Sequence, residues 1–179
     1  KNLFYFLNTE MTANFLDFFM PFITTKANFV EIIFFAWIII FIVGKWKERK
    51  ALVIVVLAVL ASDLAADIIK SLVQRVRPCN EFSDINVLVG CTNSFSFPSG
   101  HATNSFAAAM YLSYYYKKYF PFFFIMAFII AYSRIYVGVH YPLDVVSGAL
   151  IGCAGALIAI KADKRAGPAV VGLYDNILN

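Results

Sequence analysis

The chain has 179 residues, of which 61% are hydrophobic and 17% aromatic, and its formal net charge at pH 7 is +4. Soluble domains average roughly 45–50% apolar residues, and several apolar runs of this chain approach the ~20 residues that cross a hydrocarbon core. The composition therefore excludes an ordinary soluble domain and predicts an integral membrane protein. The basic residues stand in short clusters at the ends of apolar runs, which is typical of membrane topology and argues against a nucleic-acid partner.

Residues 1–25 mix phenylalanines with polar side chains and are too interrupted to cross a membrane. We interpret them as one or two amphipathic helices in the membrane interface, ended by Pro21, and the alternative is a frayed spanning helix. Five better candidates follow: Asn28–Gly44, Ala51–Val73, Ser99–Tyr116, Pro121–Val137 and Leu143–Ile160. The expected fold is therefore all-α, an integral membrane bundle of five transmembrane helices plus an N-terminal interfacial amphipathic segment.

The fifth candidate helix contains the stretch SGALIGCAGA, whose small residues permit close helix packing. We expect residues 1–166 to form a single membrane-embedded domain. Residues 167–179 form a tail that carries no motif.

The basic clusters orient this bundle. Gly44–Lys50, Lys117–Lys118 and Lys161–Arg165 fall on one side if five helices alternate, and the positive-inside rule makes that side cytoplasmic. Topology does not explain the basic residues that remain on the outer side: Lys70, Arg75, Arg77 and Arg134. Ionisable groups near hydrocarbon are costly, so these residues indicate a functional site.

Three segments converge on the outer face: KSLVQRVRP, PSGH and SRIYVGVHYPLD. Their cations Lys70, Arg77 and Arg134 predict an anionic ligand with several oxygens, most simply a phosphate. Ser99 and Gly100 open a helix, whose N-terminal N–H groups favour an anion, and Gly100 allows close approach of the backbone. We expect all five residues to bind phosphate.

The two histidines of the chain, His101 and His140, suit two different roles. Asp144 can hold one ring nitrogen of His140, which leaves the other free to attack phosphorus. His101 can protonate the departing oxygen and then accept a proton from water. Neighbouring fixed cations would repel a metal ion, so we expect no metal and no other cofactor. Asp67 is within pairing reach of Lys70, and a structural role is expected for it.

The pattern K-x6-RP, PSGH and SR-x5-H-x3-D resembles the type 2 phosphatidic acid phosphatase family, which is related to bacterial acid phosphatases and vanadium haloperoxidases. The resemblance spans Lys70 to Asp144 and includes Pro78 and Gly138. It implies metal-free hydrolysis through a phosphohistidine at His140, in an all-helical bundle with its site on the outer face. Members commonly have six spanning helices, whereas this chain shows five and an interfacial segment.

The resemblance also implies a substrate class and a location. Bacterial members of this size act on lipid A 1-phosphate, undecaprenyl pyrophosphate, phosphatidylglycerophosphate or phosphatidic acid. Short loops favour lipid A phosphate or an isoprenoid pyrophosphate. We expect a bacterial inner (plasma) membrane protein whose active site faces the periplasm, with the bilayer and a membrane lipid phosphate as its partners.

Several alternatives stay open at this point. A lipid phosphotransferase would use the same intermediate and the same residues, and a non-catalytic lipid-binding member would keep the fold. Cys79 and Cys91 flank one polar loop and could form a disulfide or stay as free thiols. Arg75 matches no motif and could meet a lipid headgroup or only solvent. The sequence leaves the oligomeric state open.

Overall fold

The computed structural model describes residues 1–178, and it describes side chains for residues 1–165. Regular structure in this part of the chain is entirely helical. In chain order the helices are α1 (Asn2–Tyr5), the π-helix η1 (Phe6–Glu10), α2 (Asn14–Thr24), α3 (Ala27–Val43), α4 (Trp46–Val73), α5 (Pro78–Glu81), α6 (Gly100–Tyr115), the 3-10 helix η2 (Lys117–Tyr119), α7 (Phe120–Tyr136) and α8 (Pro142–Leu178).

A long helix lies at each of the five predicted apolar runs, namely α3, α4, α6, α7 and α8. Two of them are longer than expected, since α4 begins at Trp46 rather than Ala51 and α8 continues past Ile160. Hydropathy locates only the apolar part of a helix. Lysine, arginine and glutamate are good helix formers, so the backbone continues through charged residues. The predicted boundary at residue 166 stays a prediction, because side chains of the tail lie outside the described residues.

Three helical stretches are long and apolar enough to cross a membrane: Trp46–Glu81, Lys117–Tyr136 and Pro142–Arg165. Helices α2 and α3, bent by 51° at their junction, would make a fourth span together. No side chain of α3 is buried, and Ile32, Phe35 and Ile42 are each more than 60% exposed. A helix that is apolar on all sides and unburied indicates lipid contact, so the protein is an integral membrane protein.

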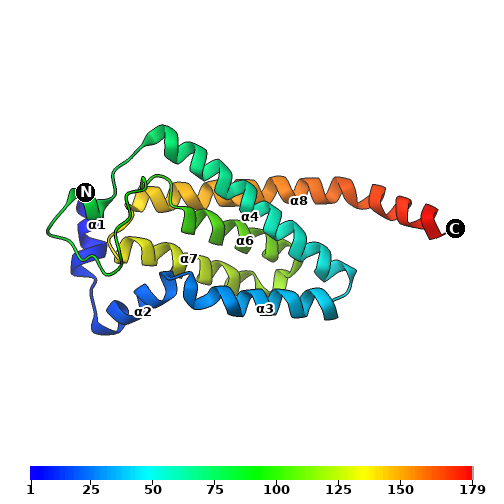
Figure 1. The fold of residues 1–179 in the computed structure, drawn as a ribbon, viewed down its shortest axis with the longest axis horizontal. Helices are drawn as coiled ribbons and strands as arrows, with labels where there is room; N and C mark the ends of the chain where they lie inside the picture. Colours follow the sequence, from blue (N-terminus) through cyan, green and yellow to red (C-terminus); the bar gives the residue numbers. More distant parts are fainter. Residues whose placement is uncertain (179) are drawn as a thin grey trace.

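Helix α6 occupies the centre of the bundle, between α4, α7 and α8 (Figure 1). Glycines on α8 allow the close approach. A Cβ atom at Gly148 would lie 2.5 Å from the Ser99 carbonyl oxygen, and one at Gly152 would lie 2.9 Å from the backbone nitrogen of Ala107. The small residues of α8 thus face α6, which confirms the predicted close packing.

The N-terminal segment packs against the end of the bundle where α7 stops and α8 starts (Figure 1). The Asn8 side chain is fully buried, and its amide donates to the carbonyl oxygens of Asn86 at 3.0 Å and Tyr136 at 2.7 Å. Tyr136 in turn donates its hydroxyl to Asp17 at 2.6 Å. Buried polar contacts therefore hold this segment in place, where the sequence alone shows only an interruption of an apolar run.

The prediction that Pro21 ends the N-terminal helix was wrong. Helix α2 contains Pro21 and continues to Thr24, and the chain bends after that residue, at Thr25 and Lys26. The missing N–H of a proline removes one helical hydrogen bond, but the carbonyl of Pro21 still accepts from the Thr25 amide at 3.2 Å. The bend therefore lies one turn later than predicted.

Candidate active site

The candidate site forms at the end of the bundle that holds the N-terminus, where α4 ends, α6 begins and α7 joins α8 (Figure 1). The α7–α8 connection turns sharply at Gly138, whose φ of +81° is unfavourable for residues with a Cβ atom. After this turn the amides of Val139 and His140 both donate to the carbonyl oxygen of Arg134, at 3.2 and 3.1 Å. The sequence thus folds back to place His140 immediately before α8.

His140 and Asp144 lie together, as their spacing predicts. Asp144 is fully buried in the first turn of α8, and its Oδ2 lies 3.5 Å from Nδ1 of His140. The same oxygen accepts the Tyr141 amide at 2.8 Å, which fixes the carboxylate. At 3.5 Å the contact to His140 is longer than a regular hydrogen bond, and such contacts are often long in ligand-free sites.

Arg77 approaches the other ring nitrogen of His140. Its Nη1 lies 3.0 Å from Nε2 of His140, while Nε donates to the Ser94 carbonyl oxygen at 2.8 Å and Nη2 to the Ser94 hydroxyl at 2.9 Å. A guanidinium group can only donate, so Nε2 is the acceptor and the imidazole proton belongs on Nδ1, facing Asp144. The lone pair of Nε2 therefore faces the cationic side of the site.

Burial and charge keep the His140 imidazole neutral. The ring is 2% exposed, and burial is the main cause that lowers its pKa to about 4, against the favourable effect of Asp144. The positive charges of Arg77 and Arg134 lower the pKa further. Both guanidinium groups are therefore close enough to act on His140, and at neutral pH its Nε2 is unprotonated, with a lone pair that accepts from Arg77.

Thr24, at the α2–α3 bend, connects two further predicted site residues. Its hydroxyl accepts a hydrogen bond from Nη1 of Arg134, and its carbonyl oxygen lies 3.1 Å from Nε2 of His101. A carbonyl can only accept, so Nε2 of His101 carries a proton. His101 lies within electrostatic reach of both Arg134 and His140. The two histidines and two arginines therefore share one site.

Lys70 reaches this site from the end of α4. It forms the predicted ion pair with Asp67, at 2.9 Å, and a Cβ atom built on Gly100 would lie 4.0 Å from its Nζ. That Cβ would meet its nearest protein atom, Oδ1 of Asp63, at an ordinary 3.5 Å. Packing within the chain therefore does not require glycine at position 100. Close approach of a ligand to the backbone remains as a reason for a glycine there.

Besides Nδ1 of His140, which faces Asp144 at 3.5 Å, the buried Ser99 hydroxyl and Nε of Arg134 have no hydrogen-bond partner among the described residues. Ser99 precedes α6, and its amide donates to the Asp144 carbonyl oxygen at 2.9 Å. A buried unpartnered polar group costs about 1–3 kcal/mol, and a bound anion would accept from both groups. These donors are compatible with an anion at the start of α6, and the predicted phosphate binding there stays a prediction.

Sequence reasoning missed the roles of Arg75 and Thr24 in this arrangement. Arg75 donates from Nη1 to Oδ1 of Asp144 at 3.0 Å, and its guanidinium lies 3.9 Å from the ring centre of Tyr141. The sequence did indicate a function for Arg75, because Arg75 is one of the outer basic residues that topology does not explain. Thr24 had no such signal, because its contacts depend on how the N-terminal segment packs.

The loop between α5 and α6 contains a disulfide between Cys79 and Cys91, with a Cα–Cα distance of 6.0 Å. This decides between the two states that the sequence left open. Among the described residues, no group of three or more His, Cys, Asp or Glu side chains is arranged to hold a metal ion.

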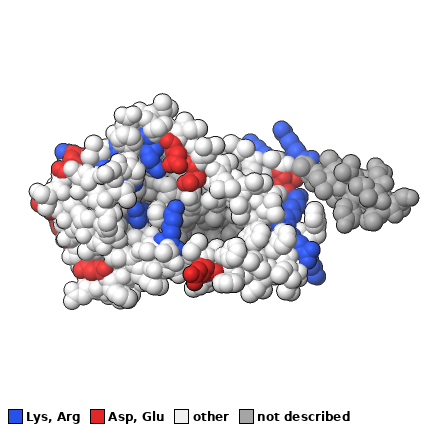
Figure 2. Space-filling model, in the orientation of Figure 1, with Lys and Arg blue, Asp and Glu red and all other residues white. Residues whose placement is uncertain are grey.

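Charged side chains form two groups on the surface in Figure 2, and the surface between them is largely uncharged. One group lies over the site end and the other at the far end of the bundle. The second group includes Lys47, Lys50, Lys117 and Lys164, which line one pocket. The three predicted cytoplasmic clusters therefore do lie at a common end, opposite to the site.

Residues 51–168 match the family model of the PAP2 superfamily. Over 152 residues the chain is 36% identical to the lipid A 4'-phosphatase of Bacteroides thetaiotaomicron, a match that covers 79% of this chain and 67% of that protein. It is 29% identical over 119 residues to the undecaprenyl-diphosphatase of Sulfolobus acidocaldarius, covering 66% of this chain and 58% of that protein. The chain thus spans little more than half of that second relative.

A solved structure shares this fold. The crystal structure of Aquifex aeolicus LpxE superposes with a TM-score of 0.77 at 31% sequence identity, covering 89% of this chain and 93% of that one. The motif spacing, the helical arrangement and the family match agree with one another. The chain belongs to the PAP2 superfamily, as the spacing of its motifs predicts.

Proposed function

We propose that this chain is a lipid phosphatase that hydrolyses a phosphate monoester or pyrophosphate of a membrane lipid through a phosphohistidine at His140. The observation that carries the proposal is the placement of His140 between a carboxylate and a guanidinium group. Asp144 faces Nδ1, and Arg77 faces Nε2 at 3.0 Å. The nitrogen that carries the lone pair is therefore the one that points toward the cations.

In the first step, Nε2 of His140 attacks phosphorus and the bond from phosphorus to the lipid oxygen breaks. The negative charge of the bound phosphate favours the imidazolium form of His101, which gives a proton to that departing oxygen and becomes neutral. The ring of His140 becomes positively charged as the N–P bond forms, and the carboxylate of Asp144 stabilises it through Nδ1–H.

The transferring phosphoryl group needs positioning and neutralisation more than covalent chemistry. Arg77 and Arg134 supply fixed guanidinium forks, and Lys70 supplies a third charge. The N-terminal N–H groups of α6 and the Ser99 hydroxyl add donors at the start of the helix. These groups act as the phosphate-binding set.

In the second step, water attacks the phosphohistidine and the N–P bond breaks. His101, now neutral, accepts a proton from the water, and inorganic phosphate leaves. Both histidines return to their starting protonation states. Thr24 and Arg75 touch catalytic groups rather than the reacting atoms, so we assign them as positioning residues.

The site is proposed to lie at the periplasmic boundary of the membrane. Asp144 and Asp163 lie on the same helix α8, and a rise of 1.5 Å per residue separates them by about 28 Å, close to the thickness of a hydrocarbon core. Asp163 lies among the lysines of the far end, which the positive-inside rule assigns to the cytoplasm. The Cys79–Cys91 disulfide at the site end supports an oxidising compartment.

In this arrangement α3, α4, α6, α7 and α8 are the five proposed transmembrane helices. The N-terminal segment lies at the outer interface, where its exposed Phe15 and Phe18 face lipid. A substrate whose tail stays in the bilayer then brings its phosphate to the cations at the boundary.

The names of the relatives support two substrate classes, a lipid A phosphate and an isoprenoid pyrophosphate. We place lipid A phosphate first, because the Bacteroides protein shares the higher identity with this chain. The proposed cellular location is the inner membrane of a bacterium.

The test is a panel assay of purified protein against lipid A phosphates, undecaprenyl pyrophosphate, phosphatidylglycerophosphate and phosphatidic acid. We expect release of inorganic phosphate from at least one of them, and loss of this release in His140→Ala. Labelled phosphate that moves to a second lipid instead of water would indicate the phosphotransferase. Turnover retained in His140→Ala, or none with any lipid phosphate, would contradict the proposal.

A further inference from the structure

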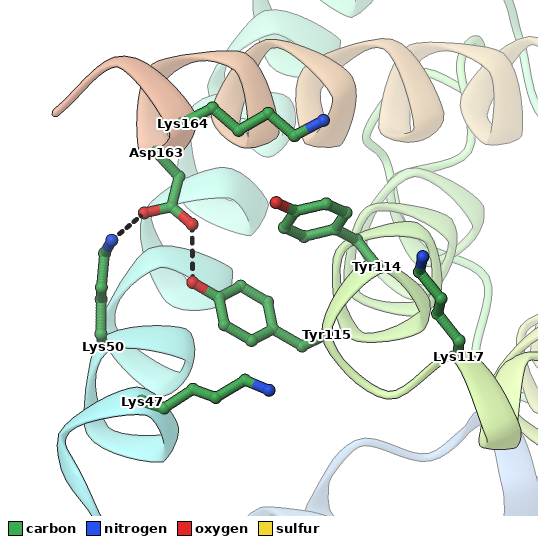
Figure 3. A pocket seen from close by; sticks show the side chains of 7 residues that line it. All are labelled: Lys47, Lys50, Tyr114, Tyr115, Lys117, Asp163 and Lys164. Carbon is green, nitrogen blue, oxygen red and sulfur yellow. Dashed lines mark hydrogen bonds and ion pairs between the residues drawn. The ribbon is translucent and has the colours of Figure 1, made fainter. Parts of the chain in front are cut away.

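A cavity lies at the opposite end of the bundle from the proposed active site. It has a volume of about 600 Å³ and is formed by the start of α4, the end of α6, η2 and α8. Four lysines line it, Lys47, Lys50, Lys117 and Lys164, together with Tyr114, Tyr115 and Asp163 (Figure 3). Ligand pockets commonly measure roughly 300–1,000 Å³, so a headgroup-sized molecule fits.

The single carboxylate of this pocket is already engaged. Asp163 is 7% exposed, binds Nζ of Lys50 at 2.5 Å and accepts the Tyr115 hydroxyl at 2.6 Å (Figure 3). It therefore compensates Lys50 and fixes the wall of the pocket. It has little capacity left to compensate the other three lysines.

Lys47, Lys117 and Lys164 have no carboxylate partner within the described side chains. Two of them lie over aromatic rings of α6, Lys47 at 5.9 Å from the Tyr115 ring centre and Lys164 at 5.1 Å from that of Tyr114. Figure 3 shows the three ammonium groups around these two rings. Three uncompensated charges around one cavity make it a site for a multiply charged anion.

We propose that this pocket binds a phosphate-bearing anion, supplied by the headgroup of an anionic lipid in the cytoplasmic leaflet. Basic pockets between transmembrane helices on the cytoplasmic side are typical sites for phosphate headgroups. The helices that form the pocket carry exposed apolar side chains nearer the bundle centre, including Val53 and Ile158, along which acyl chains can lie. A lipid bound here bridges α4, α6 and α8, the helices that also carry the proposed active site.

The positive-inside rule alone places lysines at this end without any binding site, and matched variants separate the two explanations. The pocket variant combines Lys47→Gln, Lys117→Gln and Lys164→Gln. The control variant combines Lys45→Gln, Lys118→Gln and Lys161→Gln, which removes the same charge from exposed lysines of the same end that do not line the pocket. Both variants retain every residue of the proposed active site.

The measurement is the melting temperature of each protein in a neutral detergent, titrated with short-chain phosphatidylglycerol and, separately, phosphatidylcholine or inorganic phosphate. We expect phosphatidylglycerol to raise the Tm of the unmodified protein and the control variant, by about 5 °C at a lipid concentration about 100 times its Kd. The pocket variant should show an apparent affinity about 100-fold weaker, since each lysine near an anionic lipid contributes about fivefold. Phosphatidylcholine should have no effect.

Inorganic phosphate distinguishes the source of the anion. Inorganic phosphate could raise the Tm of the control variant as much as phosphatidylglycerol does, and leave the Tm of the pocket variant unchanged. In that case the phosphate site stands, and its ligand is a soluble anion rather than a lipid. Equal responses of the two variants to phosphatidylglycerol, or no response of the unmodified protein, would overturn the proposal. Lipid hydrolysis should stay within about twofold in both variants, so the result does not depend on the proposed catalytic function.

Discussion

The two ends of the helical bundle both gather basic side chains, but they hold them in different ways. At the site end Arg77 is 7% exposed and its three guanidinium nitrogens all have hydrogen-bond partners in the protein. At the far end Lys47, Lys117 and Lys164 are exposed and contact at most an aromatic face. Fixed guanidinium groups can stabilise a transition state without reorganising, whereas mobile ammonium groups suit reversible attraction. The difference is consistent with the proposed chemistry at the first end and the proposed anion binding at the second.

Removing the nucleophile should have the largest effect. We expect His140→Ala to lower kcat/KM for the lipid substrate by about 10⁵-fold or more, because no covalent intermediate can form. Steady-state phosphate release measures this, with Lys161→Gln as a variant of the far end that should retain its rate. Comparable losses in these two variants would remove the distinction between the two ends.

The loss of kcat/KM in Asp144→Asn should be about tenfold to a hundredfold smaller than the loss in His140→Ala. The Asn variant loses the orientation of the His140 ring but keeps the nucleophile. Arg75→Gln should lower kcat/KM by a smaller factor than Asp144→Asn, since Arg75 acts only through Asp144. The same assay ranks the three variants. Near-total loss of activity in both Asp144→Asn and His140→Ala would contradict this order.

His101→Ala should lower hydrolysis of a lipid phosphate by about 10²- to 10⁴-fold, because the leaving oxygen loses its acid. An aryl phosphate whose leaving group needs no proton should form the phosphoenzyme at a nearly unchanged rate in this variant. Burst-phase kinetics measure that step. An equal defect with both substrates would show that His101 is not the general acid.

The acidic limb of kcat/KM should lie near pH 4 rather than pH 6.5, because burial and two guanidinium groups lower the pKa of His140. Protonation below this pKa removes the lone pair of Nε2. Arg77→Gln removes a neighbouring positive charge and should move the limb to higher pH, while Asp144→Asn removes a stabilising carboxylate and should move it lower. Shifts of the same sign in the two variants would contradict the geometry of the site.

The smallest effect is expected from a chelator. EDTA should leave the rate of phosphate release unchanged, because Lys70, Arg77 and Arg134 supply the positive charge that phosphoryl transfer needs. The assay is repeated with added Mg²⁺ or Zn²⁺. A strong loss that one of these ions restores would contradict the proposal.

Local sequence features predicted most of the helices of the bundle and several contacts at the candidate site. Apolar runs located α3, α4, α6, α7 and α8, because a helix that crosses hydrocarbon is apolar where it faces lipid or the bundle core. The spacing of His140 and Asp144 across the start of α8 predicted their contact, since both positions belong to one short segment. The four outer basic residues, Lys70, Arg75, Arg77 and Arg134, were found as exceptions to the charge rule.

What the sequence could not predict depends on contacts between distant segments. Asn8 looked like an interruption of an apolar run, and its amide instead caps the end of α7. Thr24 contacts both His101 and Arg134 only because the N-terminal segment folds over the site. Arg75 pairs with a residue far along the chain, and no periodicity or motif marks that pairing.

The most direct test of the central claim is to trap the intermediate. Rapid acid-free quenching of enzyme mixed with a ³²P-labelled lipid phosphate, followed by peptide mapping, should find base-stable, acid-labile phosphate on His140. The label should accumulate in His101→Ala with an activated aryl phosphate and be missing in His140→Ala. Turnover at the full rate with no label on His140, or with label on another residue, would contradict the account.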